Sequence, residues 1–213
     1  MRSDVPKPIV EINGKPICAH AIEAFERSAV IDSIVVVGHK DQLSQIRDIV
    51  DRYRFRKVIK VVTGGATRRE SVANGIAALD GDTDVVVVHD GARPLVSAKV
   101  IEDAVRLCAQ WDAVVTAVPV KPTIKRVTGG DMCVTQTLNR DELWEAQTPQ
   151  VFKKDILAKA HAQYPHANPS DDAVMVEALG VKVRIVQGDY ANIKITTRED
   201  LAAAESLRKE VSC

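Results

Sequence analysis

The amino-acid sequence predicts an α/β fold with a doubly wound, mostly parallel, Rossmann-like sheet. Segments typical of strands and of amphipathic helices alternate from residue 9 to residue 118, which favours right-handed strand–helix–strand crossovers. The four consecutive valines at residues 85–88 cannot alternate between core and solvent, so they are typical of a strand that is buried on both faces. The length of 213 residues suits a single domain.

The composition argues against several classes of function. Lysine plus arginine and aspartate plus glutamate both number 29, so the chain lacks the basic signature of a nucleic-acid binder. No apolar run approaches the roughly 20 residues that span a bilayer, and the first residues lack the apolar core of a signal peptide. The cysteines show no metal-binding spacing, so we expect reduced thiols in a cytoplasmic protein. They are Cys18, Cys108, Cys133 and Cys213.

The first half of the chain predicts five strands and four helices. Pro6 and Pro8 mark a loop, because proline fixes φ and biases the preceding residue away from helix. Ser97 is a plausible N-cap for the helix that follows it. The expected strands are residues 9–12, 34–37, 58–62, 85–88 and 113–118, and the expected helices are residues 17–28, 39–52, 69–79 and 97–110.

The alternation breaks at residues 119–147, which form a protruding arm in this interpretation. Residues 121–127 and 132–138 are typical of two strands of a hairpin that turns at Gly129-Gly130. Because a lone hairpin is rarely stable in water, we expect it to pack against something, and a partner subunit is a natural candidate. Beyond the arm we expect helices at residues 152–164, 171–179 and 198–209 and a strand at residues 181–187.

The residues that follow the valine strand carry the first functional signal. Asp90, Gly91 and Arg93 lie at its carboxyl end, and ligands of open α/β sheets bind at that edge. The alternative is a strand that ends in a polar turn. A general-base role for His89 is disfavoured, because a residue of a buried strand points into the core or away from the pocket.

Three more stretches could bind phosphates, and each has a structural alternative. Gly64 and Gly65 would let the backbone approach a phosphate, to which Ser71 and the start of the following helix offer donors. The alternative is that these residues form only a turn with an N-cap. Residues 147–152 are polar and rigid, or they are a capped helix start. Lys194 lies in an alternating, strand-like run at residues 192–196, where lysine is more often a solvated edge charge. The histidines form no ligand pattern, and neither a GxSxG elbow nor a P-loop lysine motif occurs.

Eight motifs occur in one order along essentially the whole chain. They are Pro6-Lys7, Gly14-Lys15-Pro16, Gly64-Gly65 with Arg68 and Ser71-Val72, His89-Asp90-Gly91-Ala92-Arg93-Pro94, Arg140 with Leu143-Trp144, Gln147-Thr148-Pro149-Gln150, Asp171-Asp172-Ala173 and Asn192-Ile193-Lys194-Ile195-Thr196. Together they closely resemble the 2-C-methyl-D-erythritol 4-phosphate cytidylyltransferase family. The resemblance implies a nucleotidyltransferase sheet and the transfer of CMP from CTP to a sugar-alcohol phosphate with release of pyrophosphate. It also implies Mg²⁺ bound through nucleotide phosphates near Asp90, and a homodimer formed through the arm.

The resemblance also implies roles for individual residues. Lys7 would neutralise the CTP phosphates and stabilise the transition state, and Arg140 and Lys194 would hold the attacking phosphate. The nucleotide would contact Lys7, Gly64, Gly65, Ser71, Asp90 and Gly91. The acceptor would contact Asp90, Arg93, Thr123, Arg140, Thr148, Ser170 and Lys194, with Thr123 reaching the neighbouring active site.

The sequence departs from the family pattern in several places. The family's first strand and its Ala-Ala-Gly-x-Gly-x-Arg loop, which wraps the triphosphate, would precede Met1, so we expect this chain to lack them. Pro8 stands for glutamine, Ala66 for an acid, Gly91 for alanine and Ser170 for threonine. Two alternatives stay open: a cytidylyltransferase for ribitol 5-phosphate or another pentitol phosphate, and a non-catalytic nucleotide-binding or dimer subunit.

Overall fold

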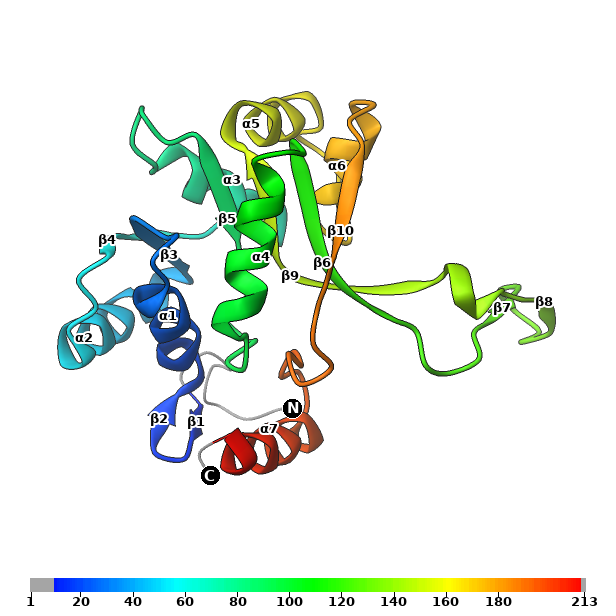
Figure 1. Ribbon diagram of the computed structural model, residues 1–213, viewed down its shortest axis with the longest axis horizontal. Coiled ribbons are helices and arrows are strands. Elements are labelled where there is room, and N and C mark those ends of the chain that lie inside the picture. The colour runs from blue at the N-terminus through cyan, green and yellow to red at the C-terminus, as the bar shows by residue number, and fades with distance from the viewer. Residues whose placement is uncertain (1–9, 212–213) are drawn as a thin grey trace.

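The computed structural model describes residues 10–211 and contains a four-stranded sheet with helices on both faces (Figure 1). The strand order is β10-β6-β9-β5, with β5 at Val85–Val88, β6 at Ala113–Pro119, β9 at Trp144–Lys153 and β10 at Val183–Gln187. β10 pairs in parallel with β6, and β9 runs antiparallel between β6 and β5. β5, β6 and β10 therefore share one direction, and the expected mostly parallel α/β sheet is confirmed.

A second, parallel pair of strands lies beside the first helices. It consists of β3 (Ile34–Gly38) and β4 (Val58–Thr63). Within residues 10–211, β5 is paired only along its β9 edge, and β3 and β4 form a separate sheet. Residue 9 of the expected strand at residues 9–12 lies outside the described residues, and β1 (Glu11–Ile12) pairs with β2 (Lys15–Pro16) in a small hairpin.

Strand β9 corrects the interpretation of residues 147–152 as a capped helix start. These residues form the central, antiparallel strand, and helix α5 begins only at Lys154. Gln147, Thr148 and Gln150 are buried in it although they are polar, so the apolar pattern that identifies a strand is missing. The backbone of β9 pairs on both sides, with β5 and with β6, and this long-range pairing decides the conformation.

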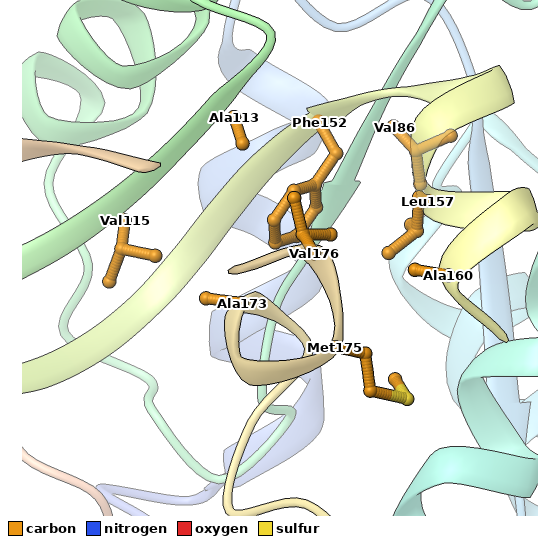
Figure 2. Packing of buried hydrophobic residues seen from close by; sticks show 9 residues of the cluster. All are labelled: Val86, Ala113, Val115, Phe152, Leu157, Ala160, Ala173, Met175 and Val176. Carbon is orange, nitrogen blue, oxygen red and sulfur yellow. The ribbon is translucent and has the colours of Figure 1, made fainter. Parts of the chain in front are cut away.

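The valine strand β5 is covered on both faces, as the sequence predicts. Val86 packs with Phe152 on the face that α5 (Lys154–Gln163) and α6 (Ala173–Ala178) cover (Figure 2), and Val88 belongs to the same cluster. Val85 and Val87 point to the opposite face and pack with α4 (Ala98–Cys108). Alternate side chains of a strand point to opposite faces, so β5 contributes to both cores.

The other helices complete the two layers. α1 (Ile17–Arg27) lies on the α4 side and packs with α2 (Leu43–Tyr53), which follows the short helix η2 (Lys40–Gln42). α3 (Arg68–Ala77) lies on the α5 side, and α7 (Arg198–Val211) packs on the β1–β2 hairpin. Ser97 caps α4 as expected, because its hydroxyl accepts from the Val100 N–H. Among the described helices, none is long and apolar enough to cross a membrane.

The expected arm extends away from the body of the molecule (Figure 1). It contains the antiparallel strands β7 (Lys125–Val127) and β8 (Val134–Thr137) and the short helix η3 (Arg140–Glu142). All seven residues of the two strands are exposed, including Val127 and Val134. Exposed apolar residues on a protruding hairpin are typical of an interaction surface.

Candidate active site

The carboxylate of Asp90, directly beyond β5, lies among three cations. Its Oδ2 lies 2.9 Å from Lys194 Nζ and 3.6 Å from Arg93 Nε, and its Oδ1 lies 3.5 Å from Arg68 Nε. Burial raises the pKa of this carboxyl, but the Lys194 hydrogen bond and the charges of Lys194, Arg68 and Arg93 outweigh burial and hold the pKa below its ordinary value. Asp90 is therefore ionised at neutral pH, within a cluster of net positive charge.

A buried hydrogen-bond network fixes the backbone at Asp90. The Asp90 N–H donates to Thr148 Oγ1 at 3.0 Å, and the Thr148 hydroxyl lies 3.0 Å from His89 Nδ1. His89 Nε2 lies 3.0 Å from the Arg93 carbonyl oxygen, which can only accept, so Nε2 carries the proton. Burial lowers the pKa of His89 to about 4, so the ring is neutral and Nδ1 accepts from the Thr148 O–H. His89 is thus a structural residue, as the sequence predicts.

Lys194 reaches Asp90 from an irregular loop. Residues 192–196 form no strand, which corrects the strand-like interpretation of this run. Arg93 Nη1 donates to the Asn192 carbonyl oxygen at 2.8 Å, and the Ile195 N–H donates to the Ala92 carbonyl oxygen at 2.9 Å. Lys194, which lies between these two contacts, has a side chain that is 43% exposed, and its Nζ pairs with Asp90.

Asn192 ties the same loop to β9. Its side chain is fully buried, and its Nδ2 donates to the Thr148 carbonyl oxygen at 2.8 Å and to Gln147 Oε1 at 3.2 Å. Gln147 Nε2 in turn donates to the Asp189 carbonyl oxygen at 2.9 Å. The buried polar residues of β9 therefore position the lysine loop, which explains why a central strand carries amides.

Arg68 is a site cation for which the sequence predicts no individual role. It is the first residue of α3, and its Nη1 donates to Asp172 Oδ2 at 2.7 Å while its Nε faces Asp90. Burial lowers the pKa of the guanidinium, but the carboxylates of Asp172 and Asp90 raise it by more, so the net shift of the pKa is upward. Its place directly after the glycine loop was the available signal in the sequence.

The Gly64–Gly65 loop forms a tight, internally bonded start of α3. The Gly65 N–H donates to Ser71 Oγ at 3.1 Å, and Thr67 and Glu70 form a complete capping box. A Cβ on Gly64 would lie 2.7 Å from Ser71 Oγ, and one on Gly65 would collide with Glu70. The glycines are thus required by the approach of α3, so the turn with an N-cap is confirmed as the local structure.

The remaining predicted residues lie in different places. Gly91 is exposed beside Asp90, and Ser170 is exposed directly before Asp171, whose carboxylate accepts from Gln150 at 2.9 Å. Thr123 lies between β6 and β7, and Arg140 begins η3, so both belong to the arm, which extends away from the body (Figure 1). Arg140 Nη1 donates to the Lys121 carbonyl oxygen at 3.0 Å. Lys7 lies outside the described residues.

The site offers little protein ligation for a metal ion. Among residues 10–211 there is no group of three or more histidine, cysteine, aspartate or glutamate side chains that could hold one. Asp90 is the one carboxylate in direct contact with Lys194 and Arg93 among the described ion pairs. This donor set fits a Mg²⁺ ion that takes most of its oxygen ligands from substrate phosphates and water.

Comparison with known proteins identifies the family. The family model of 2-C-methyl-D-erythritol 4-phosphate cytidylyltransferase matches residues 1–210. The chain belongs to this family. It is 41% identical over 212 residues to the cytidylyltransferase of Alkaliphilus oremlandii, covering 98% of this chain and 89% of the relative. It is 44% identical to that of Pelotomaculum thermopropionicum, with the same two coverages.

A solved structure supports the fold as well as the family. The 4-diphosphocytidyl-2C-methyl-D-erythritol synthase of Anaerococcus prevotii superposes with a TM-score of 0.88 at 32% identity, covering 96% of this chain and 90% of that one. The chain is therefore a cytidylyltransferase, and the family, fold and enzyme class that the sequence predicts are confirmed.

Proposed function

We propose that the chain transfers CMP from CTP to 2-C-methyl-D-erythritol 4-phosphate and releases pyrophosphate, as a cytoplasmic homodimer. The observation that carries this proposal is the cluster of Lys194, Arg93 and Arg68 around Asp90, at the carboxyl end of β5 in a member of the cytidylyltransferase family. Two polyanions must meet in this reaction, and a cluster of cations with one ionised carboxylate suits that task.

The proposed reaction is a direct displacement at the α-phosphorus of CTP. A phosphate oxygen of the acceptor attacks, the bond from the α-phosphorus to the bridging oxygen breaks, and pyrophosphate leaves with that oxygen. The attacking phosphate is already ionised at neutral pH, so no general base is needed. This agrees with the burial of His89, whose two ring nitrogens both have hydrogen-bond partners. Catalysis then consists of positioning and of neutralising charge.

The residues divide between the two substrates. Gly64, Gly65 and Ser71 line the cytidine side, and Asp90 and Gly91 lie between nucleotide and acceptor. Lys194 holds the attacking phosphate, with Arg93 beside it, and the exposed Ser170 contributes a hydroxyl. Thr148 serves the acceptor through the Asp90 backbone, because its buried hydroxyl already bonds Asp90 and His89. The resemblance gives Lys7 the phosphates of CTP.

The arm supplies the remaining acceptor contacts across the dimer. Thr123 was expected to reach the neighbouring site, and Arg140 lies on the same arm. We therefore propose that both residues act in the active site of the partner subunit, where Arg140 joins Lys194 on the attacking phosphate. The exposed Val127 and Val134 support this proposal, because a partner surface would cover them.

Mg²⁺ is the proposed cofactor. When bound, it would neutralise charge on the nucleotide phosphates. Asp90 is the described residue that could contribute an oxygen ligand, and its low pKa keeps that oxygen ionised.

Turnover of two acceptors by the purified protein tests the proposal. The protein is incubated with CTP and Mg²⁺ plus either 2-C-methyl-D-erythritol 4-phosphate or ribitol 5-phosphate, and pyrophosphate release is measured. We expect turnover of the first acceptor. Turnover of ribitol 5-phosphate alone would favour the pentitol alternative, and absence of pyrophosphate release with either acceptor would favour a non-catalytic subunit.

A further inference from the structure

A buried carboxylate stands behind the active-site cluster and has no role in the proposed reaction. Asp172 lies at the start of α6 and is fully buried. Its Oδ2 accepts from Arg68 Nη1 at 2.7 Å, and its Oδ1 lies 2.9 Å from Nε2 of the buried His161 on α5. A buried carboxylate is costly unless its oxygens are paired, and here both oxygens have a partner.

Arg68 connects this carboxylate to Asp90. Its planar guanidinium presents several N–H groups in fixed directions, so one end can be held while another faces a second group. Nη1 binds Asp172, and Nε lies 3.5 Å from Asp90 Oδ1. Lys194 and Arg93 face the other oxygen, Oδ2. Among the described ion pairs, Arg68 is thus the cation that faces Oδ1.

The contacts come from elements far apart in the sequence. Arg68 and Asp172 are separated by 104 residues, and His161 and Asp172 join α5 to the start of α6. The amides of Gly65, Ala66, Thr67 and Glu70 bond within the capping box and to Ser71. The side chain of Arg68 extends from this helix to Asp90.

We propose that Asp172, supported by His161, is a positioning residue that holds Arg68 so that its guanidinium orients Asp90 for the acceptor. This inference rests on the proposed function of the Asp90 site. Arg68 then contributes to the reaction by orienting Asp90, and Asp172 affects the reaction only by holding Arg68.

A double-mutant cycle tests the proposal. The kcat/KM for 2-C-methyl-D-erythritol 4-phosphate is measured for wild type, Arg68→Met, Asp172→Asn and the double variant. We expect about a tenfold loss or more in each single variant, typical of a lost charge-assisted contact. The double variant should be no worse than Arg68→Met, because Asp172 has nothing left to hold. Independent, multiplying losses would overturn the proposal, as would an Asp172→Asn variant with normal kinetics.

Two controls separate positioning from charge and from folding. Arg69→Met removes the neighbouring cation of α3, whose described ion pair is with Glu70 at 3.9 Å. An equal loss in Arg69→Met would show that net charge, and not the Arg68 contact, matters. Thermal unfolding is recorded for every variant. If Asp172→Asn does not fold, the Arg68 variants still test the proposal. We expect Arg68→Lys to recover part of the activity that Arg68→Met loses. Unchanged kinetics in Arg68→Met would refute a role of Arg68 in the reaction.

A second readout does not depend on turnover. The pKa of the Asp90 carboxyl is followed by carbon NMR in the same four proteins. Because the Arg68 charge lowers this pKa, Arg68→Met should raise it. In the Asp172→Asn background the same change should have little further effect, since Arg68 is already released. A full upward shift in both backgrounds would contradict the inference. Absence of turnover by the wild-type protein would contradict only the proposed function.

Discussion

Replacing Thr148 by valine tests the network that fixes Asp90. Valine keeps the shape of threonine and suits a strand, so β9 should persist. Thr148 is only 4% exposed. The change removes its hydroxyl, which accepts from the Asp90 N–H and donates to His89 Nδ1. Two polar groups then lose their partner inside the protein.

The size of the effect follows from these two contacts. Leaving a buried donor or acceptor unsatisfied costs about 1–3 kcal/mol. For the pair we expect the free energy of unfolding to fall by about 3 kcal/mol, which lowers Tm by roughly 6–12 °C in a protein of this size. Because Asp90 would shift, kcat/KM should also fall by about tenfold or more.

The assay compares Thr148→Val with Thr148→Ser. Serine keeps the hydroxyl and loses one methyl group, so it should cost only about 1 kcal/mol and retain activity. Thermal unfolding at one fixed protein concentration and steady-state kinetics give both quantities. A Thr148→Val protein with wild-type Tm but poor use of the acceptor would refute this reasoning, because it would place the hydroxyl on the substrate.

Three further predictions concern charge, pH and assembly. Lys194→Ala should lower kcat/KM for the acceptor by roughly 10–100-fold, as expected for a lost charge-assisted contact, while the exposed Lys99→Ala should not; equal kinetics for the two would remove Lys194 from the site. The pKa of His89 is about 4 in the folded protein and near 6.5 when unfolded, so only the unfolded chain gains this proton as the pH falls through that window. The free energy of unfolding should therefore decrease by up to about 3 kcal/mol as the pH falls from about 6.5 to about 4. Denaturant titrations at several pH values should show that the free energy of unfolding of His89→Gln depends less on pH over this range. Lysine at both Val127 and Val134, which pair across the exposed hairpin, should yield monomers by light scattering, and an intact dimer would show that the arm is not the interface.

The local part of this fold could be predicted from the sequence. Periodicity placed the helices and most strands, the four valines identified β5, and Ser97 marked the start of α4. These features depend on residues a few positions apart, which a linear pattern contains. The ordered motifs also identified the family, and the valine run placed Asp90, Gly91 and Arg93 at the carboxyl end of a strand.

Only the tertiary structure decided what those residues touch. β9 is a central strand because its backbone pairs with β5 and β6, although its buried amides disguise it. Lys194 lies 2.9 Å from Asp90 because Arg93 and Asn192 hold its loop. Asp172 binds Arg68 across 104 residues. Such contacts depend on which chain segments meet in three dimensions, and spacing along one sequence carries no record of that.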